Sequence, residues 1–194
     1  MRHFKNIPLL IEDLFQKSDT SRLTYHTYAH TLEVSSKVLV AARSLNLDTA
    51  ELLFVAGLFH DTGYLFGYQK HEAKSMELAE HYLIKNQIPF EEINFINECI
   101  AATELGVSPL QEAAALLKDC DLSYGITDKF FERGPQLRKE WELNLDKFYS
   151  DEDWEKLQLD FLEHVLFSSN YAKTHFMPIV EENLLLQRKR ILTV

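Results

Sequence analysis

Cysteine, glycine and proline are all scarce in this sequence. The 194 residues include two cysteines, six glycines and five prolines. Two cysteines without a CxxC spacing exclude a disulfide scaffold. So few glycines and prolines argue against a β-sandwich or barrel with many turns. We therefore expect a compact protein whose fold depends on a hydrophobic core.

A long hydrophobic run and an excess of positive charge are also missing. The longest uncharged apolar stretch, residues 52–59, is far shorter than the roughly 20 residues that cross a bilayer. The apolar run 7–11 is interrupted by Glu12 and Asp13, unlike a secretory signal. Twenty lysines and arginines against 30 acidic residues give a net charge of −10, which opposes binding to nucleic acid or an anionic membrane. We expect a cytoplasmic protein with neither partner.

Apolar residues recur at helical spacing along almost the whole chain. The pattern predicts helices over residues 5–17, 26–45, 50–59, 71–85, 90–103, 109–122, 128–148, 151–167 and 178–192, with an interruption at Gly134-Pro135. The sequence thus indicates an all-α fold, a single helical bundle of about seven to nine helices. We expect one domain over 1–194, with a core at about 22–125 on which C-terminal helices at about 126–192 pack.

Two of the predicted helices carry histidines where an apolar residue is expected. His26 and His30 share the buried stripe of the predicted helix 26–45, so their side chains are expected to point the same way. His60 and Asp61 end the apolar helix 50–59, and Gly63 lets the backbone open there. Each histidine taken alone is more often a core residue than a ligand, so the grouping is what suggests a site.

Two aspartates near the end of the predicted helix 109–122 differ in their helical position. Asp121 continues the apolar stripe of that helix, whereas Asp119 falls seven residues after Glu112 on the predicted solvated face. A carboxylate directed at a core is unfavourable unless it is paired or binds a metal. Asp121 is therefore the candidate ligand, and we expect Asp119 on the surface.

Two histidines and two aspartates form a mixed nitrogen and oxygen ligand set. Such a set suits a divalent ion, namely Mn, Fe, Zn, Ni or Co, and also permits Mg. Four protein ligands leave positions for water and for a substrate oxygen. An ion held in this way lowers the pKa of a bound water and neutralises phosphate charge.

The order and spacing of these residues resemble a known family. Tyr25-His26-x-x-x-His30, His60-Asp61 and Asp121-Leu122-Ser123 are similar to the H…HD…D signature of the HD-domain metal-dependent phosphohydrolases. Further segments are similar to a bacterial subgroup of small, stand-alone predicted HD phosphohydrolases. They are His71-Glu72-x-Lys74-Ser75, Ile100-Ala101-Ala102-Thr103, Leu137-Arg138-Lys139-Glu140-Trp141, Tyr171-Ala172-Lys173-Thr174 and Glu182-Asn183-Leu184.

This resemblance implies roles for individual residues. It implies His30, His60, Asp61 and Asp121 as metal ligands, with Asp61 also orienting the attacking water, and His26 as the general acid that protonates the leaving oxygen. The implied activity is hydrolysis of a small phosphoester or phosphoanhydride by metal-activated water. We expect the substrate to be a nucleotide.

Four more residues are candidates with weaker support. His71 and Glu72 are candidates for a second metal ion or a bound water, and otherwise cap the helix that follows. Lys74 and Arg138 are candidates for binding phosphate. Otherwise Lys74 is a solvated lysine, and Arg138 forms a salt bridge with an acid such as Glu142.

Several alternatives stay open. Thr103-Glu104 replaces a histidine pair common in the family, which argues against two metals. A di-iron HD-type oxygenase and a non-catalytic module that binds a nucleotide or a metal are the other possible functions. His26 could instead orient His30. The identity of the metal, and whether the protein is a monomer or a homo-oligomer, are not determined by the sequence.

Overall fold

Every regular element in the described part of the chain, residues 4–192, is helical in this computed structural model. In chain order the elements are α1 (Ile7–Lys17), α2 (Tyr28–Ser44), α3 (Ala50–Phe59), the 3₁₀-helix η1 (Thr62–Leu65), α4 (His71–Lys85), α5 (Phe90–Ala102), α6 (Glu112–Ile126), α7 (Phe130–Leu145), α8 (Asp151–His164), α9 (Asn170–His175) and α10 (Met177–Ile191). The all-α fold is therefore confirmed. The short helix α9 was not predicted.

Helix α3 lies at the centre of the N-terminal half of the chain. Its sequence is apolar on all sides, and the side chains of Leu53, Val55 and Leu58 are fully buried. The helix packs against α1, α2, α4, α5 and α6. A helix without a polar face is stable in water only when neighbours cover it all round. This central position places the residues that follow its last turn inside the protein.

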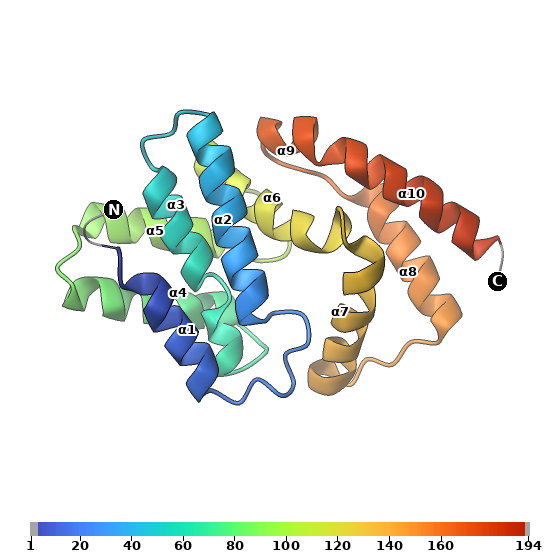
Figure 1. Cartoon of the computed structure of the whole chain (residues 1–194), viewed down its shortest axis with the longest axis horizontal. Helices are drawn as coiled ribbons and strands as arrows, with labels where there is room; N and C mark the ends of the chain where they lie inside the picture. Colours follow the sequence, from blue (N-terminus) through green and yellow to red (C-terminus); the bar gives the residue numbers. More distant parts are fainter. Residues whose placement is uncertain (1–3, 193–194) are drawn as a thin grey trace.

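Helices α2 and α3 lie side by side and in close contact (Figure 1). Gly57 permits this approach, because a Cβ atom at this position would lie only 2.9 Å from the Cα atom of Ser35. Ser35 satisfies its own hydroxyl by donating to the Thr31 carbonyl at 2.6 Å. The contact brings the first turn of α2 close to the end of α3.

The C-terminal helices α7, α8 and α10 lie on the other side of α6 from α3 (Figure 1). Helices α8 and α10 pack on each other, while α7 contacts α6. Buried apolar side chains form a single cluster that includes residues from α1 to α10. Among residues 4–192, no helix has both the length and the apolar character needed to cross a membrane.

Helices α7 and α6 depart from the sequence prediction in two ways. Helix α7 continues through Gly134-Pro135, because Arg133 is anchored to Glu33 at 2.6 Å and Gly134 lies against the Gln158 side chain. These contacts offset the backbone hydrogen bond that proline removes. Helix α6 begins at Glu112 rather than residue 109, and no side chain caps its N-terminus. It then runs to Ile126, past its predicted end.

We predict that Gly57→Ala lowers the free energy of unfolding by about 1–3 kcal/mol, the usual effect of overpacking a close contact. The added methyl group would meet the backbone of Ser35, which cannot move away without shifting α2. Urea denaturation followed by circular dichroism measures the change. Gly67→Ala is the matched control, because nothing lies within 4 Å of its added Cβ atom. Equal effects in the two variants would contradict this view of the helix contact.

Candidate metal centre

Four side chains from three segments converge in the interior. His30 lies in the first turn of α2, His60 and Asp61 directly follow α3, and Asp121 lies on α6. We call these four residues the metal group. One ligand atom from each can be chosen so that all four lie within 4.8 Å of one another. The two histidines are completely buried, and only the side chain of Asp121 is partly exposed, at 26%.

The distances within the metal group show that its donor atoms face a common point. The Nε2 atoms of His30 and His60 are 3.2 Å apart. The Oδ2 atom of Asp61 lies 2.8 Å from His30 Nε2 and 3.2 Å from His60 Nε2. The Oδ1 atom of Asp121 lies 3.2 Å and 3.5 Å from the same two nitrogens. This arrangement of two imidazoles and two carboxylates suits a divalent ion between them.

Hydrogen bonds prepare the histidines for this role. His60 Nδ1 lies 2.7 Å from the Gly57 carbonyl oxygen, to which it must donate, so neutral His60 has its lone pair on Nε2. Thr27 caps α2 and accepts a hydrogen bond from the His30 amide at 3.3 Å. Among residues 4–192, the buried Asp61 Oδ2 atom has no hydrogen-bond partner of suitable geometry. A buried carboxylate oxygen in that state fits coordination to an ion.

Opposite charges shift the pKa values in the metal group. Burial alone would lower the pKa of His30 and His60, but the Asp61 and Asp121 carboxylates outweigh it and raise both values. Burial likewise would raise the pKa of Asp61, but His60 and the other histidines around it hold the value well below its usual range. The carboxylates thus favour protonation of the histidines when no ion is bound.

His26 lies before α2 rather than on it, contrary to the sequence prediction. Helix α2 begins at Tyr28, and the preceding Thr27 is extended, with φ −94° and ψ 171°. Helical periodicity therefore does not orient His26. Instead, its Nδ1 atom makes a short contact with Oε1 of Glu140 on α7. Its ring centroid lies 5.4 Å from that of His30.

Glu140 is the residue that the sequence analysis missed. It is completely buried, and its Oε2 atom accepts hydrogen bonds from the Tyr25 and His26 amides at 2.7 and 3.0 Å. The Tyr68 hydroxyl donates to Oε1 at 3.2 Å. Burial would raise the pKa of Glu140, but the contacts with His26 and the Tyr25 amide together lower it below its usual value. Glu140 stands in a segment that resembles the HD family, Leu137-Arg138-Lys139-Glu140-Trp141, and that resemblance was the signal that could have found it.

His71 and Glu72 lie beside the metal group without completing a second one. His71 Nε2 lies 3.5 Å from Asp61 Oδ1 and 3.3 Å from Glu72 Oε1. The Tyr64 ring is stacked between His71 and His26, with centroid distances of 3.7 and 4.2 Å. Within residues 4–192, the metal group is the one set of at least three such donors that converges.

The two predicted phosphate-binding cations are engaged elsewhere. Lys74 forms an exposed ion pair with Glu77 at 2.8 Å. Arg138 forms an ion pair with Asp151 at 2.7 Å and also donates to the Tyr149 carbonyl. Its expected partner Glu142 is farther away, at 3.9 Å. The structure therefore does not bring either cation into contact with the metal group.

The prediction that Asp119 lies on the surface is wrong. Its exposed fraction is 1%, and its carboxylate accepts from the Ser169 amide at 2.6 Å, the Ser169 hydroxyl at 2.7 Å and the Ser168 amide at 3.1 Å. The start of α9 covers the face of α6 that the periodicity left to solvent. Asp119 thus joins α6 to the C-terminal helices, while Asp121 belongs to the metal group.

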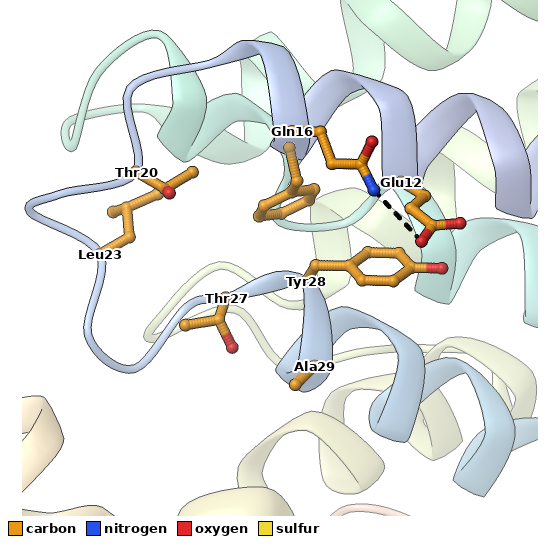
Figure 2. Close-up of a pocket in the computed structure, with 8 residues that line it drawn as sticks. Glu12, Gln16, Thr20, Leu23, Thr27, Tyr28 and Ala29 are labelled. Carbon is orange, nitrogen blue, oxygen red and sulfur yellow. Dashed lines mark hydrogen bonds between the residues drawn. The ribbon is translucent and has the colours of Figure 1, made fainter.

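A cavity of about 340 Å³ lies between the end of α1 and the start of α2. Figure 2 shows Glu12 and Gln16 of α1 at one side and Tyr28 and Thr27 below them. None of the metal group lines this cavity. It is therefore separate from the candidate metal centre.

Comparison with known proteins gives two similarities. The family model of the HD domain matches residues 27–122. The chain is also similar to the crystal structure of a predicted HD superfamily hydrolase from an uncultured Thermotogales bacterium, with a TM-score of 0.62 and 15% identity, over 96% of this chain and 92% of that chain. At this identity the likeness shows the fold alone. No curated protein matches the sequence.

We predict that His60→Ala lowers manganese affinity by more than about a hundredfold, since loss of even an outer-shell partner costs 10–100-fold. The substitution removes a nitrogen that faces the other three donors. Metal content per chain after manganese loading and dialysis, measured by mass spectrometry, checks this. His81→Ala replaces an exposed histidine and serves as control. Unchanged metal content in folded His60→Ala would contradict the site.

We predict that manganese affinity falls as the pH is lowered through the raised pKa values of His30 and His60. The sign follows from competition, because an ion binds only the deprotonated nitrogens and must displace their protons. Isothermal titration calorimetry at several pH values measures both the affinity and the protons released. An affinity independent of pH, with no proton release, would contradict this prediction.

Proposed function

Residues 27–122 of the chain belong to the HD domain family, and from this premise we propose that the protein is a metal-dependent phosphohydrolase. Its proposed substrate is a small phosphoester or phosphoanhydride, in particular a nucleotide. The observation that carries the proposal is the metal group together with His26, whose Nδ1 atom contacts the buried Glu140 carboxylate. One part can hold an ion, and the other can deliver a proton beside it.

The proposed mechanism assigns a separate task to each part of the site. A divalent ion held by the metal group would lower the pKa of a water and offset phosphate charge. Asp61 orients the water that attacks phosphorus, and the proton which that water loses passes to bulk solvent. As the bond from phosphorus to the leaving oxygen breaks, its electron pair stays on that oxygen. His26 Nε2 then donates a proton to it.

Glu140 supports His26 in this step. Because the carboxylate contacts Nδ1, it holds that nitrogen in its protonated form and leaves Nε2 on the opposite edge of the ring. The same residue accepts two backbone hydrogen bonds from residues 25 and 26, which fixes the position of the ring. Such an arrangement supports His26 as a general acid rather than as a residue that only orients His30.

Two alternative functions have less support. The metal group is the single converging set of donors in residues 4–192, which favours one ion over the two of a di-iron oxygenase. We propose that His71 and Glu72 hold a water beside Asp61 rather than a full second metal site. A module that only binds a ligand would have no use for the pairing of His26 with Glu140. Since Glu140 lies outside residues 27–122, we also propose that the whole chain acts as one domain.

We predict that manganese-loaded protein releases phosphate or a nucleoside monophosphate from a panel of nucleotides, and that His26→Gln lowers this rate by about 10²–10⁴-fold. With p-nitrophenyl phosphate the loss should be much smaller, because that leaving group needs no proton. Glu140→Gln should show the same dependence on the leaving group. Malachite green detection of phosphate and nitrophenol absorbance measure the two rates.

Asn144→Ala is the matched control for Glu140. Asn144 lies one turn farther along α7 and donates to the Arg22 carbonyl at 2.8 Å and to the backbone carbonyl of Glu140 at 2.9 Å, not to its carboxylate. Asn144→Ala removes a contact between α7 and the segment before α2, as Glu140→Gln does. It should nevertheless keep the leaving-group dependence of the unmodified protein. If metal-loaded protein hydrolyses none of the panel with manganese, iron, cobalt or magnesium, the proposed function is wrong.

A further inference from the structure

A phosphorylated substrate is anionic and binds more tightly where a positively charged side chain lies close to it. The protein carries a net charge of −10, and two carboxylates belong to the metal group itself. A divalent ion offsets those two carboxylates and leaves the phosphate without a counter-charge. Lys74 and Arg138 are held in ion pairs with Glu77 and Asp151. Another cation close to the metal group would therefore favour binding.

Lys118 lies on α6 three residues before Asp121. Side chains three apart on a helix are neighbours on the same face, with Cβ atoms about 5–6 Å apart. The Lys118 Nζ atom donates to the Ala102 carbonyl at 2.9 Å and to the Glu104 carbonyl at 2.6 Å. Ala102 is the last residue of α5, and Glu104 follows it. These two bonds hold the ammonium group against the end of α5, on the side of α6 that also carries Asp121.

The partners of Lys118 differ from those of the other cations next to α6. Arg133 is paired with Glu33 at 2.6 Å, and Lys37 donates to the Ser123 hydroxyl at 2.9 Å and lies 3.9 Å from Glu33. Lys118 instead bonds to two neutral carbonyls, and no carboxylate of residues 4–192 forms an ion pair with it. An ammonium group has three N–H donors. One of them remains for a further acceptor.

The electrostatic surroundings of Lys118 agree with this position. Burial lowers its pKa, and nearby carboxylates oppose that effect. The strongest of these is Asp121 of the metal group, and Glu72, which contacts His71, also contributes. Lys118 thus lies in the electric field of carboxylates on both α6 and α4.

We propose that Lys118 binds the phosphate group of the substrate. Its third N–H donates to a phosphate oxygen, while the two carbonyls keep the ammonium group from folding away into solvent. The ligand class is an anionic phosphate, whether a phosphoester, a phosphoanhydride or the free phosphate product. This inference rests on the proposed function and adds to it the residue that recognises the anion.

The test uses inorganic phosphate as the probe and manganese-loaded full-length protein. Lys118→Met removes the charge but keeps an unbranched side chain, and Lys118→Arg keeps the charge. Lys74→Met is the matched control, because it removes an ion-paired lysine on the neighbouring helix α4. Isothermal titration calorimetry at constant ionic strength gives the affinity for phosphate. Metal content and thermal unfolding are measured for each variant.

We expect Lys118→Met to weaken phosphate binding by about tenfold to a hundredfold, as for loss of a hydrogen bond to a charged group. Lys118→Arg should retain most of the affinity, and Lys74→Met should change it by no more than about twofold, as for an exposed ion pair. For a hydrolysed substrate, Lys118→Met should raise KM more than it lowers kcat.

Phosphate affinity within about twofold of the unmodified value in folded, metal-loaded Lys118→Met would overturn the inference. An equal loss in Lys74→Met would also overturn it, because the effect would then be one of general charge. Lys118→Arg serves as the test if Lys118→Met does not fold. The inference is then wrong if folded Lys118→Arg binds phosphate as weakly as the metal-free protein does. Phosphate binding without hydrolysis would contradict the proposed function and leave this inference standing.

Discussion

The packing of α2 against α3 is the constraint on which the rest of the site depends. Gly57 lets the two helices approach so closely that His30 and His60 meet with their Nε2 atoms 3.2 Å apart. Two imidazoles in that position, joined by the Asp61 and Asp121 carboxylates, would be unfavourable in an apolar core without a shared partner. Packing of the hydrophobic core thus fixes the positions of α2 and α3. It leaves buried nitrogen and oxygen atoms between them that an ion can coordinate.

Helix α6 connects this frame to the C-terminal half of the protein. Asp121 faces the metal group, and Asp119, two residues earlier, accepts hydrogen bonds from the start of α9. Beyond α6, Glu140 of α7 reaches back to His26. The residues matched by the HD domain end at residue 122, so the C-terminal helices contribute a buried carboxylate to the candidate centre from outside that segment.

Charge is distributed unevenly around the candidate centre. Histidines and carboxylates dominate its interior, and most of the cations near it are tied to acids of neighbouring helices. Such pairs leave little positive charge free for an anionic ligand. Lys118 differs because carbonyl groups hold it, so its charge is not neutralised by direct contact. The acidic protein can in this way present a local site for an anion without a basic surface.

Helical spacing was sufficient to predict the all-α fold, because that depends only on where apolar residues recur. Spacing also marked the residues of the metal group as candidates, but their role as ligands came from the resemblance to the HD family. Tertiary contacts decided what periodicity cannot report. Thr27 ends α2 before His26, and Glu140, 114 residues away in the chain, orients that histidine instead. Asp119 is buried only because α9 returns to cover it. Local sequence specifies which face of a helix is apolar, whereas only the folded chain specifies which distant group lies against it.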